Sequence, residues 1–180
     1  MQLYRMSSAV RARGDLVDIH DPNERLLNYF VMDVGADEFE RLLRFGPGIT
    51  ARAQENYTPR MLRTTDYLDT NLPIPMISPR LMSLIAEQTD QVQGYPCEVA
   101  CRGERFPFVL CRIVERRDFV ASTVRSWRDL SPGGPELNEA IDDGFLIARD
   151  QEHPMIYASQ RFVDMCKAQR MRIDFRAVNV

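Results

Sequence analysis

Two apolar segments on either side of a glycine-containing turn place the strongest constraint on how this chain folds. Residues 97–102 and 106–113 are rich in valine, cysteine, phenylalanine and leucine, and they flank Gly103-Glu104. Segments of this kind around so short a connection predict a β-hairpin. Pro107 cannot donate a hydrogen bond to a neighbouring strand, so we expect it at a sheet edge or at the start of a strand.

Capped helices and further short strands surround this hairpin. Ser78, followed by proline, and Ser159 each predict a helix start, because a serine side chain can accept a hydrogen bond from the first turn. Residues 171–178 alternate between apolar and polar positions and predict a closing strand. Short strands are also expected at residues 3–6, 66–68, 145–148 and 155–158. Since helices and strands mix without regular βαβ spacing, the sequence predicts an α+β fold with short, mostly antiparallel strands and a few amphipathic helices.

The first third of the chain carries weaker signals. Asp21, followed by proline, predicts a helix start, while residues 29–32 fit either the end of that helix or a strand. Residues 37–43 predict a second helix, with acidic residues in its first turn. Its expected core-facing side chains are Phe39, Leu42 and Leu43.

A segment interrupted by glycine, proline and polar residues follows this helix. Residues 46–63 are therefore expected to form a loop. This loop predicts a boundary between an N-terminal appendage, residues 1–62, and a main α+β domain, residues 63–180.

Composition excludes several classes of protein. The chain has 180 residues, 44% hydrophobic and 27% charged, and can bury enough surface to fold without disulfides or metal. A formal net charge of −3 is not that of a nucleic-acid-binding domain, so we expect no nucleic-acid partner. No apolar run approaches the roughly 20 residues of a membrane span, and the N-terminus lacks the pattern of a signal peptide. We therefore expect a cytoplasmic protein with no membrane partner.

The cysteines and histidines do not form a recognisable catalytic or metal-binding motif. The four cysteines lie within apolar patterns, where free cysteine behaves as a small core residue: Cys97, Cys101, Cys111 and Cys166. A nucleophilic pair of a cysteine with His20 or His153 stays formally open. Zinc binding would need a fourth ligand that the sequence does not suggest. We expect no catalytic residue, no metal and no cofactor, and hence no enzyme.

Two features of the sequence suit a protein-binding surface. Acidic residues gather in two clusters, which would attract a basic partner: Asp15, Asp18, Asp21 and Glu24, then Glu136, Glu139, Asp142 and Asp143. The single tryptophan, Trp127, lies in a polar segment beside a glycine- and proline-rich loop and would suit an interface anchor. Both features also have an ordinary interpretation, because surface acids keep proteins dissolved and most tryptophans pack partly into the core.

The order of motifs after residue 65 resembles a known family. The helix start Pro75-Met-Ile-Ser-Pro-Arg-Leu-Met-Ser-Leu-Ile is followed by Tyr95-Pro-Cys-Glu-Val and Phe108-Val-Leu-Cys-Arg-Ile. Met155-Ile-Tyr-Ala-Ser-Gln-Arg-Phe-Val-Asp-Met and Ile173-Asp-Phe complete the pattern. Together they are similar to the DUF1629 group, the eleventh family of bacterial polymorphic-toxin immunity proteins. The resemblance covers about residues 65–178.

This resemblance implies a cytoplasmic antidote that binds a cognate secreted toxin and protects the producing cell. It brings no catalytic residue and does not identify the docking surface, so Trp127 and the acidic cluster of Glu136, Glu139, Asp142 and Asp143 are expected contacts on local composition alone. Two alternatives stay open. The chain is an adaptor or chaperone for a secreted effector, or a small enzyme that uses a cysteine.

The acidic-cluster hypothesis predicts a salt-dependent interaction. Reversing the charges of Glu136, Glu139, Asp142 and Asp143 removes the attraction to a basic partner, so binding weakens and its dependence on salt flattens. Titrations of the partner at several salt concentrations measure both effects. Unchanged affinity in the charge-reversed variant would dismiss this cluster.

Overall fold

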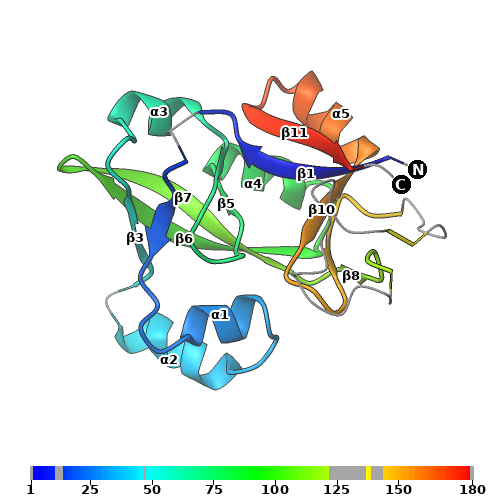
Figure 1. Ribbon diagram of the computed structural model, residues 1–180. Coiled ribbons are helices and arrows are strands. Elements are labelled where there is room, and N and C mark those ends of the chain that lie inside the picture. The colour runs from blue at the N-terminus through cyan, green and yellow to red at the C-terminus, as the bar shows by residue number, and fades with distance from the viewer. Residues whose placement is uncertain (1, 11–13, 47, 122–136, 139–143, 179–180) are drawn as a thin grey trace.

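The computed structural model describes residues 2–10, 14–46, 48–121, 137–138 and 144–178. Strands of two sheets and five helices fill this part of the chain (Figure 1). The helices are α1 (Arg25–Phe30), α2 (Ala36–Phe45), α3 (Pro59–Thr64), α4 (Pro79–Ala86) and α5 (Gln160–Ala168). The chain is an α+β protein with mostly antiparallel strands, which confirms the predicted fold class.

The larger sheet is built around the predicted hairpin. Its order is β2-β3-β6-β7-β5-β4, and β6 and β7 pair over ten residues each. The pairing of β3 with β6 is parallel, and the other pairings between these strands are antiparallel. The strands are β2 (Val17–Ile19), β3 (Thr50–Ala53), β4 (Tyr67–Leu68), β5 (Met76–Ile77), β6 (Val92–Cys101) and β7 (Glu104–Ile113). The hairpin turn lies at Arg102 and Gly103, whose φ angles of 49° and 86° suit a tight hairpin connection.

The smaller sheet joins the two ends of the chain. Its order is β11-β1-β10-β9-β8, so the first strand lies between two of the last ones. The strands are β1 (Leu3–Ser8), β8 (Arg116–Arg117), β9 (Ile147–Asp150), β10 (Ile156–Ser159) and β11 (Ile173–Val178). The predicted closing strand is β11, and it pairs antiparallel with β1 along six residues.

Strand β7 is buried on both faces and separates two hydrophobic cores. Phe106, Phe108 and Leu110 pack into the first core, together with residues of α1, α2 and β3. The alternate residues Cys111 and Ile113 pack into the second core, with residues of α4, α5 and the smaller sheet. A third core covers the other face of the smaller sheet. The alternation of side chains along one strand thus fixes a layered arrangement of two sheets and three cores.

Strands from residues 1–62 take part in both sheets. β1 extends the smaller sheet, and β2 and β3 extend the larger one beside β6. The prediction that residues 46–63 form a loop is wrong in two places, because this segment contains β3 and most of α3. Thr58 caps α3 by accepting a hydrogen bond from the Met61 amide, a signal comparable to that of Ser78. The division into residues 1–62 and 63–180 stays a prediction.

Other sequence predictions are confirmed. Ser78 and Ser159 cap α4 and α5, accepting hydrogen bonds from the amides of Leu81 and Phe162. Residues 29 and 30 are helical, which settles the ambiguity at the end of α1. Pro107 lies on β7 beyond the short stretch where β5 pairs, so one side of that strand is unpaired there. None of the described helices combines the length and the apolar character needed to cross a bilayer.

Asp66 ties the two sheets together through one buried carboxylate. Its side chain is 3% exposed and accepts hydrogen bonds from Ser78 Oγ at 2.6 Å and from Arg80 Nε at 2.7 Å. It also accepts one from the Arg172 amide, at the start of β11, at 2.7 Å. Burial alone would raise the pKa of Asp66, but the hydrogen bonds from Arg80, Arg172 and Ser78 outweigh it and hold the pKa below its usual value.

Replacement of this carboxylate is expected to destabilise the whole fold. Asp66→Asn leaves Arg80 without a charged acceptor, and we expect a loss of about 2–4 kcal/mol in the free energy of unfolding at neutral pH. Because the folded pKa is lowered, this stability is complete above the ordinary aspartate value of about 3.9 and is lost as the pH falls through the folded pKa.

Urea denaturation of wild type, Asp66→Asn and the exposed control Asp90→Asn at several pH values measures this effect. The difference in the free energy of unfolding between wild type and Asp66→Asn should decrease as the pH drops below about 4. A difference that is absent at pH 7, or that does not change with pH, contradicts the assignment.

Candidate protein-binding surface

The structure does not describe the residues of the later part of the chain that the sequence predicts to contact a partner. This holds for Trp127, Glu136, Glu139, Asp142 and Asp143. Their role therefore stays a prediction. The described part of the chain shows two other surface features. One is a polar hollow beside β3, and the other is the helical hairpin of α1 and α2, which exposes several apolar side chains.

The three aspartates of the first acidic cluster accept hydrogen bonds within the chain. Asp15 accepts hydrogen bonds from the backbone and side-chain nitrogens of Asn56 at 2.7 and 3.0 Å, and these lower its pKa. Asp18 accepts one from the Gln54 side chain at 2.8 Å. Asp21 accepts one from the amide of Leu27 in α1 at 2.9 Å. These aspartates therefore hold local structure, which accounts for their presence without any partner.

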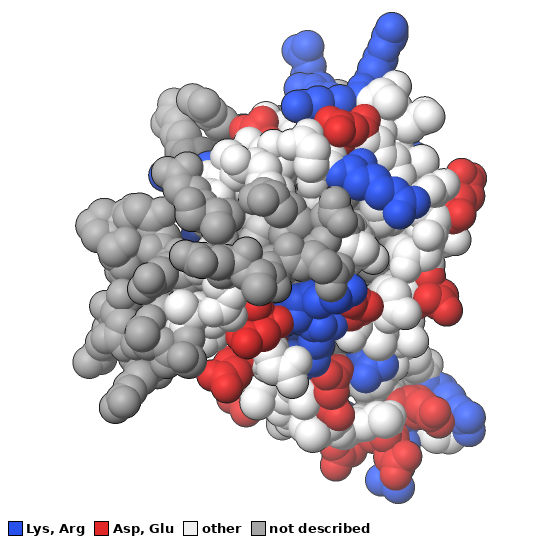
Figure 2. Space-filling model, turned by 90° about the vertical axis from the view of Figure 1, so that its right-hand side faces the viewer, with Lys and Arg blue, Asp and Glu red and all other residues white. Residues whose placement is uncertain are grey.

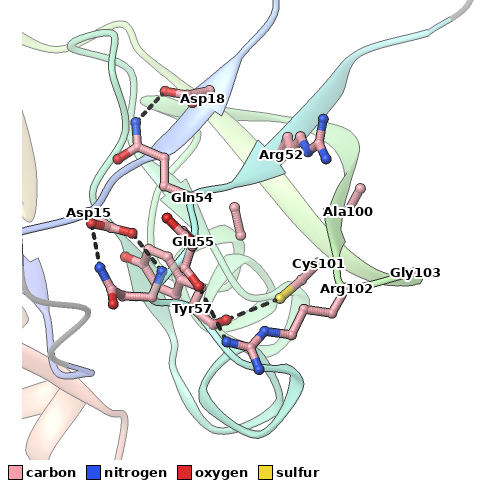
Figure 3. Close-up of a pocket in the computed structure, with 12 residues that line it drawn as sticks. Asp15, Asp18, Arg52, Gln54, Glu55, Tyr57, Ala100, Cys101, Arg102 and Gly103 are labelled. Carbon is pink, nitrogen blue, oxygen red and sulfur yellow. Dashed lines mark hydrogen bonds between the residues drawn. The ribbon is translucent and has the colours of Figure 1, made fainter.

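Asp15 and Asp18 line a hollow of about 1080 Å³ between β3 and the β6–β7 turn (Figure 3). Two contacts within the hollow involve its own backbone: Arg102 donates to the Glu55 carbonyl, and Cys101 Sγ lies 3.7 Å from the Tyr57 carbonyl. Burial, and then the charge of Asp69, raise the pKa of Tyr57 to about 12, so its phenol stays protonated. The described lining therefore offers no nucleophile paired with a base.

All four cysteines are buried, as the sequence predicts. Burial raises the pKa of Cys97 and of Cys166 to about 12, and it also raises the pKa of Cys101 and Cys111. A thiol with a raised pKa forms little of the nucleophilic thiolate at neutral pH. The described residues also contain no group of three potential metal ligands.

The hairpin formed by α1 and α2 exposes apolar side chains. Of the five large apolar side chains that are exposed in the described part of the chain, four lie between residues 32 and 45. They are Met32, Val34, Leu43 and Phe45, and Phe45 is 84% exposed. In Figure 1 the two helices lie below the larger sheet, away from α5 and β11. Concentrated exposed apolar surface is typical of a site that binds another protein.

An aromatic cluster fixes this hairpin on the larger sheet. The rings of Tyr29 in α1 and Phe39 in α2 are stacked with their centroids 4.0 Å apart. Tyr95 in β6 meets Phe30 edge-on at 5.3 Å, and the hydroxyls of Tyr95 and Tyr29 are 2.5 Å apart. Each aromatic pair contributes about 0.5–1.5 kcal/mol beyond its buried area. These aromatic contacts therefore anchor the two helices to the larger sheet.

Charged contacts hold the turn between the two helices. The Asp33 carboxylate accepts hydrogen bonds from Arg112 at 3.1 Å and from Arg116 Nε at 2.8 Å, and Arg116 also donates to the Val31 carbonyl. The Arg112 guanidinium lies 4.6 Å from the centre of the Tyr29 ring. Figure 2 shows acidic and basic side chains interspersed over the described part of one face. Because charges of opposite sign are paired here, they stabilise local structure and do not create a field of one sign that would attract a distant partner.

The sequence predicts α2 correctly but assigns one of its exposed side chains to the core. Phe39 is buried and Leu42 is half-buried, as predicted. The prediction that Leu43 faces the core is wrong, because its side chain is exposed. Only the side of α2 that faces the aromatic cluster is covered, and no further element of the described chain is packed over Leu43. An apolar stripe wider than the covered side is the signal that could have indicated a binding surface.

Comparison with known proteins adds no relative. No protein-family model matches the chain, and a search of curated proteins found no match. The resemblance of residues 65–178 to the DUF1629 immunity proteins therefore stays a prediction.

The buried cysteines give a direct test of the cysteine-enzyme alternative. We expect all four thiols of the native protein to react with iodoacetamide far more slowly than those of the urea-unfolded chain, because the folded state shields them and raises their pKa. Mass spectrometry of timed samples counts the modified sites. One cysteine reacting in the native protein as fast as in the unfolded chain would revive that alternative.

Proposed function

We propose that the chain is an immunity protein that binds and neutralises a cognate secreted bacterial toxin within the cytoplasm of the producing cell. The exposed apolar side chains of the α1–α2 hairpin carry the proposal, because four of the five large ones in the described chain gather on this one element. We further propose that this hairpin contacts the toxin.

The resemblance of the later motifs supports the same conclusion. The helix that begins at Ser78, the β6–β7 hairpin and the helix that begins at Ser159 all contribute residues to the second core. The motifs that carry the resemblance thus make one packed body. The α1–α2 hairpin lies outside the range of the resemblance, as expected if the body supplies a common scaffold and the hairpin supplies the choice of partner.

Neutralisation sets a requirement on affinity. An antidote must stay bound to the toxin, and a dissociation constant of about 1 nM corresponds to about −12 kcal/mol. In such interfaces a few buried aromatic side chains carry most of the binding energy. Phe45 is the aromatic side chain of the hairpin best placed for that role, because it is 84% exposed in the free chain.

A matched pair of surface variants tests the proposal. Phe45→Ser should weaken toxin binding by about 2 kcal/mol or more, which is at least about 30-fold. Val114→Ser removes an exposed apolar side chain elsewhere, 38% exposed, and should leave the affinity unchanged. The toxin is obtained by affinity capture of the tagged chain from its native cells, and calorimetry measures both variants.

Inhibition of the captured protein separates the antidote from an adaptor. At protein concentrations near the dissociation constant of the variant, we expect the toxin's activity to be lost in the complex with the wild-type chain and to return in part when Phe45→Ser replaces it. A captured partner that stays fully active while bound contradicts the immunity function and favours the adaptor alternative. Equal loss of affinity in the Phe45 and Val114 variants contradicts the role of the hairpin.

A further inference from the structure

Strand β11 forms the outer edge of the smaller sheet. Within the described residues it pairs with β1 on one side only, and it is the longest strand that ends either sheet (Figure 1). Proteins usually protect such edges with a very short strand, a proline, a lysine or a bulge. β11 is six residues long, contains no proline or lysine, and pairs with β1 in an uninterrupted register. Its outer side is therefore able to pair with another strand.

Backbone groups of alternate residues point out of this edge. The Ser8 amide donates to the Asp69 carboxylate at 3.0 Å, so Ser8 and its partner Ile173 do not exchange backbone hydrogen bonds. Hydrogen-bonded and other pairs alternate along an antiparallel ladder, so the amides and carbonyls of Ile173, Phe175 and Ala177 face away from β1. Nothing in the described part of the chain is hydrogen-bonded to these groups.

The two charged side chains of β11 lie beside charges of their own sign. Arg176 is opposite Arg5 of β1, and like charges in this position destabilise a strand pair. Asp174 lies near Asp69, because burial, and to a smaller extent the charge of Asp174, raise the pKa of Asp69. Asp174 and Arg176 are exposed, and neither forms an ion pair with a described residue. Each would be stabilised by an opposite charge from outside the chain.

We propose that β11 pairs antiparallel with β11 of a second copy of this chain, around a two-fold axis beside Phe175. In this register Phe175 lies opposite Phe175 of the second copy and Ile173 lies opposite Ala177, so the outward groups of both chains bond to one another. Asp174 then lies opposite Arg176 at two places related by the axis. These are positions without mutual backbone hydrogen bonds, where opposing side chains come closest.

The charges select this register over its neighbours. A shift of two residues in one direction brings Arg176 opposite Arg176, and a shift in the other direction brings Asp174 opposite Asp174. Both shifts place like charges against each other, which is unfavourable. The same surface patch is thus complementary to itself, as a two-fold dimer requires.

The dimer goes beyond the proposed function and does not depend on it. In Figure 1 the α1–α2 hairpin lies away from β11, so pairing of β11 leaves that surface uncovered. One six-residue strand pair is small beside a standard interface of about 1,600 Å², so we expect a dissociation constant on the order of micromolar.

Sedimentation velocity of the free, full-length chain tests the dimer at concentrations from about 1 to about 300 µM. Wild type should pass from monomer to dimer over this range. Asp174→Arg and Arg176→Asp should each weaken the dimer by about tenfold or more, because each places like charges opposite each other twice. The double variant, which exchanges the two charges, should restore it. A wild-type chain that stays monomeric throughout overturns the proposal and leaves the edge to a strand of another protein.

Two further variants serve as matched controls. Ala177→Pro removes an outward amide and should abolish the dimer, whereas Glu87→Arg reverses an exposed charge after α4 and should leave it unchanged. Circular dichroism checks that each variant is folded, and the charge variants decide the question if Ala177→Pro does not fold. A dimer that neither single charge reversal weakens, or that the double variant fails to restore, overturns the proposed pairing.

Discussion

The burial of β7 on both faces is the constraint on which the rest of the structure depends. Phe106, Phe108 and Leu110 face one core, and Cys111 and Ile113 face the next, so neither layer can shift without disturbing the other. Ten residues of β6 pair with this strand and hold it in register. A register slip of one residue would exchange the two faces, which is why this hairpin specifies the fold so strongly.

The α1–α2 hairpin depends on the same two strands. Tyr95 of β6 and Arg112 of β7 both contact Tyr29 in α1, and Arg112 also reaches Asp33 in the turn between the helices. These contacts anchor the hairpin to the sheet, and its surface exposes four large apolar side chains among charged ones. A preorganised surface loses little conformational entropy when a partner binds, which favours the tight complex that the proposed neutralisation would require.

Sequence reasoning succeeded where a local signal coincided with the packing. The serines before α4 and α5 cap their helices as expected, and the alternation of residues 171–178 gives β11. It failed where tertiary contacts decide: Thr50–Ala53 has little apolar character, yet forms β3 because β2 and β6 flank it. The exposure of Leu43 depends on which surfaces the other elements leave uncovered. The apolar stripe of α2 is visible in the sequence, but the part of it that the fold leaves uncovered is not, so the candidate protein-binding surface could not be located from the sequence.

Hydrogen–deuterium exchange of the free chain and of its captured complex shows whether the α1–α2 hairpin is the docking surface. The account predicts added protection of the backbone amides in α1, α2 and the turn between them, residues 25–45, when the partner is bound. Amides in the core of β6 and β7 should already be protected in the free chain and should change little. Protection confined to other segments, with residues 25–45 exchanging as in the free chain, would contradict the claim that this hairpin is the docking surface.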